Sequence, residues 1–332
     1  MPRSSPGGGI LRYLRSSWQG WPIALSLSLA WTPVRAEDLP SPPKISPPRV
    51  VGYVQLRETW QDHLGLAATL NRARIGAEGG LPSRFSYRVL IELEAPASGR
   101  NPGTPSLRDA YIRWSSAPVS LWFGQFKTPF SREYITSITA IETADRATVV
   151  DTLATKRDIG VMADYAIGSL ATLAFGVFNG EGQNANGNRD STVLPIARAT
   201  LRPIPQVTLG ASGARYGPDS SRVGFEASFE ERGYLARGEY IFQHRQGIAE
   251  NDEGWFALLG ARVMPWLQLI AKQEDFRRDF IGPARRMKAS TLGANVDFPG
   301  GHSRLIVDWV ARESGATLKR RDLVIGQLQV RF

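Results

Sequence analysis

The 332-residue sequence has a formal net charge of +9 and no cysteine, so neither disulfides nor cysteine-ligated metal sites are available. The charge is modest and is not gathered into the basic runs of a nucleic-acid-binding protein. No segment after residue 36 contains the run of about 18 apolar residues that a membrane-spanning helix needs.

The first 36 residues have the pattern of a signal peptide. A basic region without acids precedes an apolar run from Trp21 to Trp31, and small residues surround a cleavage position after Ala36. Because the leader holds only basic charges, its removal lowers the net charge to about +5. The pattern predicts an exported protein, with residues 37–48 as a Pro-rich lead-in and 49–332 as one domain; a cytoplasmic protein with an irregular start is the alternative.

From residue 49 onward the hydrophobic pattern has a period of two, which is typical of β-strands. From Tyr87 to Leu93, for example, an aromatic or aliphatic side chain occupies every second position. Ile306 and Val310 are exceptions, because they fall on the otherwise polar face of their segment. The pattern predicts about 16 strands, at residues 49–60, 69–79, 85–95, 107–116, 119–128, 157–167, 170–179, 192–202, 207–216, 221–231, 234–245, 254–264, 267–277, 287–298, 303–313 and 321–332.

The gaps between these segments alternate between long and short. Those after odd-numbered segments are long, with 217–220 as a short exception, whereas those after even-numbered segments are tight turns. This asymmetry is typical of outer-membrane barrels, and a β-sandwich would not obviously produce it. The long gaps are predicted at 61–68, 96–106, 129–156, 180–191, 246–253, 278–286 and 314–320.

A barrel of about 16 strands is too wide for side chains to fill, so we expect the apolar faces to meet lipid and the charged faces to line a watery lumen. Aromatic residues near strand ends are then candidates for interfacial girdles, with capping of a soluble core as the alternative. The candidates are Trp60, Trp114, Trp122, Trp255, Trp266, Trp309, Tyr165, Tyr216 and Tyr234.

The gap from Pro129 to Lys156, about 28 residues, is long enough to be a functional insertion. Its mixture of apolar and charged residues predicts a loop folded into the mouth of the barrel; a surface loop with a short helix is the alternative. The charged residues assigned to a constriction in this loop are Arg132, Glu133, Glu142, Asp145, Arg146, Asp151 and Lys156.

Several motifs together resemble the family called phosphate-selective porin O and P. They are Leu107–Trp114, Leu121–Ser131, Ala144–Arg146, Arg157–Val161, Phe175–Gly182 and Gln327–Phe332. The resemblance implies an all-β fold, a 16-stranded antiparallel transmembrane β-barrel with an inward-folded third outer loop, which assembles as a homotrimer. The chain ends on Phe332 of an alternating strand, which looks like the signal read by the barrel-assembly machinery.

The predicted function is passive diffusion of small hydrophilic solutes across the bacterial outer membrane, with a weak preference for anions such as phosphate. The residues predicted to guide anions along the wall are Arg72, Arg74, Arg88, Arg113, Lys127 and Arg237. Arginine suits phosphate and carboxylate groups, although pairing of each arginine with a nearby acid is the alternative. The expected partners are membrane lipid and small anionic solutes rather than nucleic acid, and no cofactor or metal is expected.

Two other functional classes are alternatives to a porin. An outer-membrane enzyme needs an activated nucleophile, but the three histidines are scattered and no Ser–His spacing stands out. A non-conducting barrel that serves as an anchor or adhesin is the second alternative, against which the short outer loops argue.

Overall fold

The computed structural model describes residues 47–93, 104–248, 252–278, 285–315 and 319–332. The predicted leader, 1–36, and residues 37–46 of the predicted lead-in lie outside the described residues.

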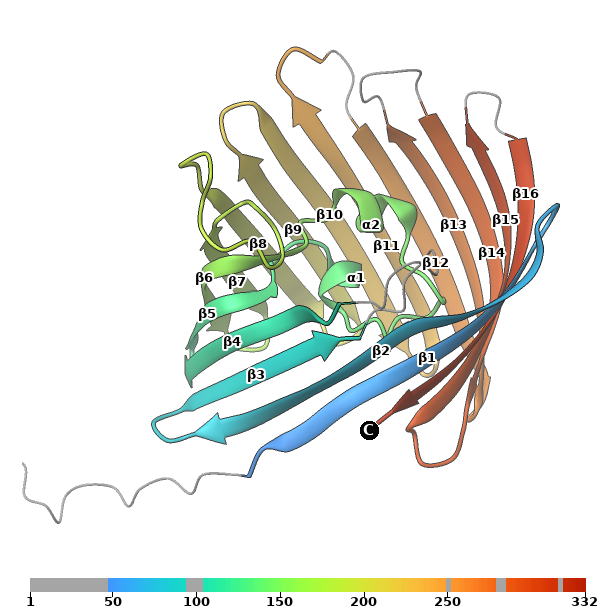
Figure 1. The fold of residues 1–332 in the computed structure, drawn as a ribbon, viewed down its shortest axis with the longest axis horizontal. Helices are drawn as coiled ribbons and strands as arrows, with labels where there is room; N and C mark the ends of the chain where they lie inside the picture. The colour runs from blue at the N-terminus through green and yellow to red at the C-terminus, as the bar shows by residue number, and fades with distance from the viewer. Residues whose placement is uncertain (1–46, 94–103, 249–251, 279–284, 316–318) are drawn as a thin grey trace, which may run out of the picture. The chain divides into compact units, whose positions relative to one another are not determined.

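The described chain forms sixteen β-strands and two short helices between the fifth and sixth strands (Figure 1). The strands are β1 (Arg49–Gln61), β2 (Gly65–Leu81), β3 (Phe85–Glu92), β4 (Ser106–Ser116), β5 (Val119–Lys127), β6 (Arg157–Ile167), β7 (Ala171–Phe178), β8 (Leu194–Ile204), β9 (Val207–Tyr216), β10 (Ser220–Glu231), β11 (Tyr234–Arg245), β12 (Asp252–Met264), β13 (Leu267–Arg278), β14 (Arg285–Asp297), β15 (Ser303–Gly315) and β16 (Lys319–Arg331). The helices are α1 (Arg132–Ile135) and α2 (Thr148–Leu153).

The sheet closes on itself as an antiparallel barrel in which each strand pairs with its neighbours in sequence and β1 pairs with β16. At the seam, Gly52 and Phe332 exchange two backbone hydrogen bonds of 2.9 and 3.0 Å. Closure leaves no unpaired sheet edge, which is the condition for a β-structure to cross a membrane. The predicted number of strands and the barrel are therefore confirmed.

The first of the predicted long gaps, 61–68, is wrong. β2 begins at Gly65 and pairs with β1 as far as Gln61, so only residues 62–64 connect the two strands. Two residues with positive φ, His63 and Gly65, form this tight connection. A register shift between Gln55 and Leu56 interrupts the same strand pair farther from the connection.

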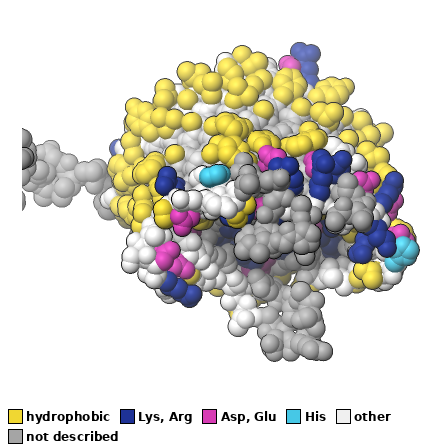
Figure 2. All heavy atoms as spheres, turned by 90° about the horizontal axis from the view of Figure 1, so that it is seen from above, with side chains coloured by type: hydrophobic (Ala, Val, Ile, Leu, Met, Phe, Trp, Pro, Cys, Tyr) yellow, Lys and Arg dark blue, Asp and Glu magenta, His cyan; other side chains and the backbone are white. Residues whose placement is uncertain are grey.

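The outer face of the barrel is apolar, as predicted. Large hydrophobic side chains such as Leu56, Ile75 and Phe225 are exposed there, whereas Gln55 and Gln329 on the opposite face are buried and share a 2.7 Å hydrogen bond. Figure 2 shows apolar side chains over the outer wall and charged side chains gathered apart from them. This arrangement is the reverse of a soluble core and suits a wall surrounded by lipid.

The predicted aromatic girdle is wrong at two positions, Trp122 and Tyr216. Strand register places Trp122 opposite Arg113 and Met162 on the inner face, and its ring centroid lies 4.9 Å from that of Tyr111. Tyr216 is partly buried against the inner core, beneath the guanidinium of an arginine in β10. Six of the other seven have exposed side chains: Trp60, Trp255, Trp266, Trp309, Tyr165 and Tyr234.

Within the described residues, none of the helices has the length and apolar character needed to cross a membrane.

Candidate functional site

The inner face of the barrel is not uniformly polar, which corrects the prediction that all apolar side chains face outward. On β11–β16, large apolar side chains alternate onto the inner face and are buried there. These residues are Leu235, Ile241, Phe256, Leu258, Ile270, Phe276, Ile306, Val310, Leu323 and Ile325. They include the two residues that break the polar pattern in the sequence, Ile306 and Val310.

The segment between β5 and β6 covers this apolar half of the wall. Val149, Val150 and Leu153 of α2 belong to the same buried cluster as the inner-face residues of β11–β13. Ala144 packs in a second buried cluster with residues of β14–β16. The hydrophobic effect therefore holds the segment to one side of the barrel. In Figure 1, α1 and α2 are drawn between the near strands and the far wall.

Four carboxylates on the inner wall accept hydrogen bonds from the backbone of this segment. Glu226 accepts from Arg132 N at 2.7 Å and Glu239 from Glu133 N at 2.5 Å. Glu274 accepts from Thr148 N at 2.7 Å, and Asp308 accepts from Ala144 N at 2.8 Å. Three of these N–H groups belong to first-turn residues of α1 or α2, which lack acceptors within a helix. The wall acids of β10, β11, β13 and β15 thus serve to bind the segment.

Side chains add further links between the segment and the wall. Arg57 donates to both carboxylate oxygens of Asp145, at 2.9 and 2.8 Å, and Arg237 pairs with Glu142. Burial tends to raise the pKa of the Asp145 carboxyl, but the hydrogen bonds and charge of Arg57 bring it below its ordinary value. Glu133 is deeply buried, and this desolvation raises its pKa.

Lys127, predicted to guide anions along the wall, makes hydrogen bonds to the segment itself. Its ammonium donates to the carbonyls of Tyr134, Ile135 and Thr136 at 2.8 to 3.0 Å. Arg146 donates to two of the same carbonyls and lies over the Tyr134 ring, 5.1 Å from its centroid. Cations are favourable at the carboxyl end of a helix, where carbonyls lack partners. All three donors of Lys127 are thus occupied at the end of α1.

The other residues assigned to a constriction separate into two groups. Glu133, Glu142, Asp145 and Arg146 bind the wall or other parts of the segment. Arg132 contributes its backbone N–H, while the side chains of Asp151 and Lys156 are exposed. The sequence could not separate these groups, because each depends on which wall residue lies opposite.

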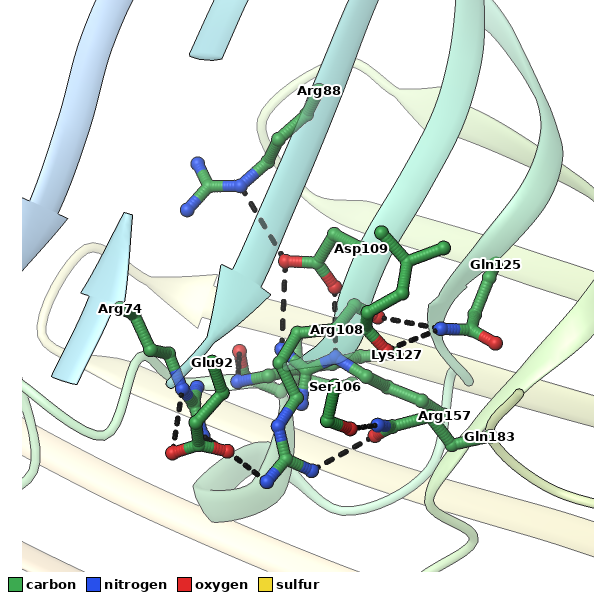
Figure 3. Close-up of polar contacts among 12 residues, drawn as sticks. Arg74, Arg88, Glu92, Ser106, Arg108, Asp109, Gln125, Lys127, Arg157 and Gln183 are labelled. Atoms are coloured by element: carbon green, nitrogen blue, oxygen red, sulfur yellow. Dashed lines mark hydrogen bonds and ion pairs between the residues drawn. The ribbon is translucent and has the colours of Figure 1, made fainter. Parts of the chain in front are cut away.

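The other half of the inner face, on β2–β6, carries an arginine network (Figure 3). Each of its three acids is shared by two arginines. Glu92 lies between Arg74 and Arg108, with an Arg74 Nε to Glu92 Oε1 distance of 3.1 Å. The other shared acids are Asp109, between Arg88 and Arg157 at 3.4 and 2.8 Å, and Glu78, between Arg49 and Arg88. Among the described residues, five arginines contact these three acids, and one of the five, Arg49 of β1, is largely exposed.

Two of the predicted arginines, Arg72 and Arg113, form no ion pair within the described part of the chain. Arg72 donates to Gln55 Oε1 at 3.1 Å, and Arg113 donates to Ser120 Oγ at 2.9 Å. Their charges are therefore not neutralised by direct contact. Arg237, the sixth predicted residue, lies away from this group on β11 and is paired with Glu142 and Glu230.

Arg108 and Arg157 belong to this network but were not among the arginines predicted to guide anions. A register shift between Leu90 and Ile91 in the β3–β4 pair brings Arg108 to Glu92, although simple alternation places it on the face opposite to Asp109. Arg157 is the first residue of β6 and is nearly fully buried against Asp109. A signal for Arg157 was its place directly after the long insertion, but its partner is 48 positions away.

The inner face of β2–β6, which carries these arginines, is called the arginine wall below. A cavity of about 390 Å³ lies between this wall and the segment that connects β5 and β6. Its lining includes five cationic and two acidic side chains: Arg74, Arg88, Lys127, Arg157, Arg198, Asp109 and Asp164. The rest of the lining is mainly aromatic, aliphatic or hydroxyl-bearing. A cavity whose described lining carries more cations than acids favours negatively charged solutes.

No group of three or more histidine or acidic side chains within the described ranges is arranged to hold a metal ion. Two of the three histidines are also far apart along the wall: His63 lies in the β1–β2 connection and His302 in the β14–β15 connection.

Comparisons with known proteins agree with this architecture. The family model for phosphate-selective porin O and P matches residues 58–234. A search of curated proteins found no match.

Solved structures share the fold at low sequence identity. The outer-membrane channel DcaP of Acinetobacter baumannii has a TM-score of 0.64 and 14% identity, covering 86% of this chain and 97% of that chain. An anion-selective porin from Comamonas acidovorans has a TM-score of 0.62 and 12% identity, covering 87% and 100%. The trimer form of the Vibrio cholerae outer-membrane protein OmpT has a TM-score of 0.61 and 9% identity, covering 86% and 99%. At such identities the likeness concerns the fold alone.

Proposed function

The chain belongs to the phosphate-selective porin O and P family, and from this premise we propose that it is an outer-membrane porin through which small hydrophilic solutes diffuse passively, anions in preference to cations. The cavity between the arginine wall and the β5–β6 segment carries the proposal, because cations outnumber acids by five to two among its described lining residues. A positive wall of low dielectric concentrates anions and repels cations.

The segment Pro129–Lys156 is proposed as an inward-folded third loop that narrows the pore. Its support is the set of hydrogen bonds to wall side chains of β1, β10, β11, β13, β14, β15 and β16. A loop attached in this way reduces the open cross-section to the side of the barrel lined by β2–β8, where the cavity lies.

The anion preference is proposed to be weak rather than strict. Most arginines of the cavity wall share an acid with a neighbour, so a passing anion competes with a carboxylate already in place. A guanidinium has five donors and can bind a second oxyanion while its ion pair persists. The preferred solutes are therefore small phosphates and carboxylates that pass through without being held tightly.

Zero-current potentials across a salt gradient in planar bilayers test this proposal. With potassium chloride on both sides, the sign of the potential should report chloride as the more permeant ion. A cation preference would contradict the anion proposal but not the pore, whereas the absence of stepwise conductance would contradict the pore itself.

Three further features belong to this proposal. Residues 1–36 act as a cleaved leader, which N-terminal sequencing of the mature protein tests.

The exposed Phe332 at the barrel seam serves as the assembly signal, so deletion of this residue should lower the amount of folded barrel in the membrane. The assembly is a homotrimer, as one structural neighbour is in its trimer form; chemical cross-linking in the membrane tests it.

A further inference from the structure

An aromatic cluster projects from β4 and β5 onto the inner face of the barrel. The ring centroids of Tyr111, Trp122 and Phe126 lie 4.9 to 6.0 Å from one another, within the range of stabilising aromatic contacts. Phe126 is nearly fully buried and also contacts Phe178, so it has a packing role. Tyr111 and Trp122 are only partly buried, and both line the cavity.

Tyr111 packs against the buried cluster with only part of its ring, and the ring also borders the cavity. No hydrogen bond of its hydroxyl occurs within the described ranges. Apolar ring area left in contact with water is costly, at roughly 25 cal/mol per Å². The proposed diffusion of small inorganic ions would be served equally well by a polar side chain at this position. A solute with an apolar ring would recover the lost contact area.

Cationic groups lie beside these rings in the same cavity. Arg88 and Arg157 share Asp109, on the strand and face that also carry Tyr111. Tyr53 adds a polar group: its side chain is 8% exposed, it lines the cavity, and its hydroxyl has no hydrogen-bond partner among the described residues. An unpaired buried hydroxyl is costly unless a ligand or water binds it.

We propose that this cavity is a binding site for organic anions that carry a carboxylate on a flat aromatic ring. The ring lies against Tyr111 and Trp122, and the carboxylate faces the Arg88 and Arg157 guanidiniums, with the Tyr53 hydroxyl as a further donor. The volume of about 390 Å³ is within the usual range of small-molecule sites. The site rests on the proposed function, since it lies on the route of the proposed pore.

Calorimetry on the detergent-solubilised full-length barrel tests the site without requiring conduction. The probes are benzoate, acetate and benzyl alcohol, which separate the contributions of the ring and the charge. Benzoate should bind at least about tenfold more tightly than either of the others, because only benzoate satisfies both the rings and the arginines. Acetate binding as tight as that of benzoate would contradict a role for the aromatic rings. Benzyl alcohol binding as tight as that of benzoate would contradict a role for the arginines.

Tyr111→Leu is the diagnostic variant, with Tyr165→Leu as its matched control on the exposed outer face of β6. Loss of one stacking ring should weaken benzoate binding by roughly fivefold in Tyr111→Leu and leave it unchanged in Tyr165→Leu. Heat-modifiable gel migration verifies that both variants fold; Trp122→Leu, which removes the other ring of the proposed site, replaces Tyr111→Leu if the latter does not fold. Benzoate affinity that is unchanged in a folded cavity variant overturns the site.

The two proposals fail in different ways. A protein that binds benzoate but shows no stepwise conductance refutes the pore and keeps the site. A conducting, anion-preferring protein that binds benzoate no better than acetate keeps the pore and refutes the site.

Discussion

The inner faces of β2–β6 and β11–β16 both carry acids, but the acids have different partners. On β11–β16, Glu239, Glu274 and Asp308 accept hydrogen bonds from the backbone of the β5–β6 segment. On β2–β6, Glu92 and Asp109 lie between pairs of arginines. The comparison teaches that the charge of a barrel lumen is set by which charges remain uncovered, not by the number on the wall.

The covering of one wall also explains why apolar residues are tolerated inside a water-filled barrel. Val149, Val150 and Leu153 of α2 are buried against the inner side chains of β11–β13, so both sets of apolar side chains are shielded from water. On β2–β6, by contrast, charged side chains such as Arg74, Arg88 and Asp109 line the cavity. The predictions below test this division, beginning with the largest expected effect.

Release of the segment from the apolar wall should have the largest effect. Val150→Asp places a charge in a fully buried position of α2, which costs several kcal/mol unless the segment leaves the wall. Single-channel conductance should then rise, on the order of twofold, because the covered half of the lumen opens.

Thr152→Asp is the control for this change, since it adds the same charge at a half-buried position of the same helix. Its conductance should remain close to that of the parent protein. If both variants conduct like the parent, α2 does not limit the opening.

Removal of charge from the arginine wall should have the next largest effect. The triple variant Arg72→Gln, Arg74→Gln and Arg88→Gln removes three cations and leaves Glu78 and Glu92 with fewer partners. The anion-to-cation permeability ratio from zero-current potentials should fall by roughly threefold or more.

Arg320→Gln with Arg321→Gln removes charge from exposed positions of β16 and serves as the comparison. Its permeability ratio should differ little from that of the parent protein. An unchanged ratio in the triple variant would show that the arginine wall does not select ions.

Replacement of Lys127 should affect stability more than selectivity. Lys127→Met leaves three carbonyls at the end of α1 without this donor, which should cost about 1–3 kcal/mol of unfolding free energy. The heat-modifiable gel transition should move to lower temperature. A normal transition with a changed permeability ratio would instead return Lys127 to its predicted role as a pore charge.

Neutralising one acid on each wall should give a smaller, contrasting pair of results. Asp109→Asn removes the negative charge between Arg88 and Arg157 and should raise the anion preference by about twofold. Glu274→Gln changes a buried wall acid that accepts a hydrogen bond from Thr148 N of α2, away from the cavity lining, and should leave the ratio unchanged. Equal shifts in the two variants would mean that the segment does not screen its wall.

The smallest effect concerns the Arg57–Asp145 ion pair. Because Arg57 lowers the pKa of Asp145, this pair contributes stability that is present above the ordinary aspartate pKa and is lost as the pH falls through the lowered value. The effect should be small, since the Asp145 side chain is 45% exposed.

Asp145→Asn should therefore flatten the acid limb of the heat-modifiable transition measured between about pH 2 and 6. The same variant should match the parent protein at the acid end of this range, where Asp145 of the parent is protonated in both the folded and the unfolded state. A difference between the two that persists at the lowest pH would assign the effect to packing.

Alternation along the sequence was sufficient to predict sixteen strands, their antiparallel closure and the apolar outer face, since side chains of a strand point to opposite sides at every second residue. The family motifs identified the porin architecture, and the matched region from residue 58 to 234 agrees with them. Alternation failed for Arg108, which lies beside a register shift. Trp122 obeys alternation, since it lies on the face opposite to the exposed Phe123, and its assignment to the girdle from its place near a strand end was wrong.

Only the tertiary structure decided which wall charges are covered and which are open. Glu239 and Asp109 follow the same strand pattern, but one lies beneath α1 and the other faces the cavity. The reason is physical: side-chain direction is local to a strand, whereas burial and ion pairing depend on what lies across the barrel, more than a hundred residues away in the sequence for Ser131 and Glu239.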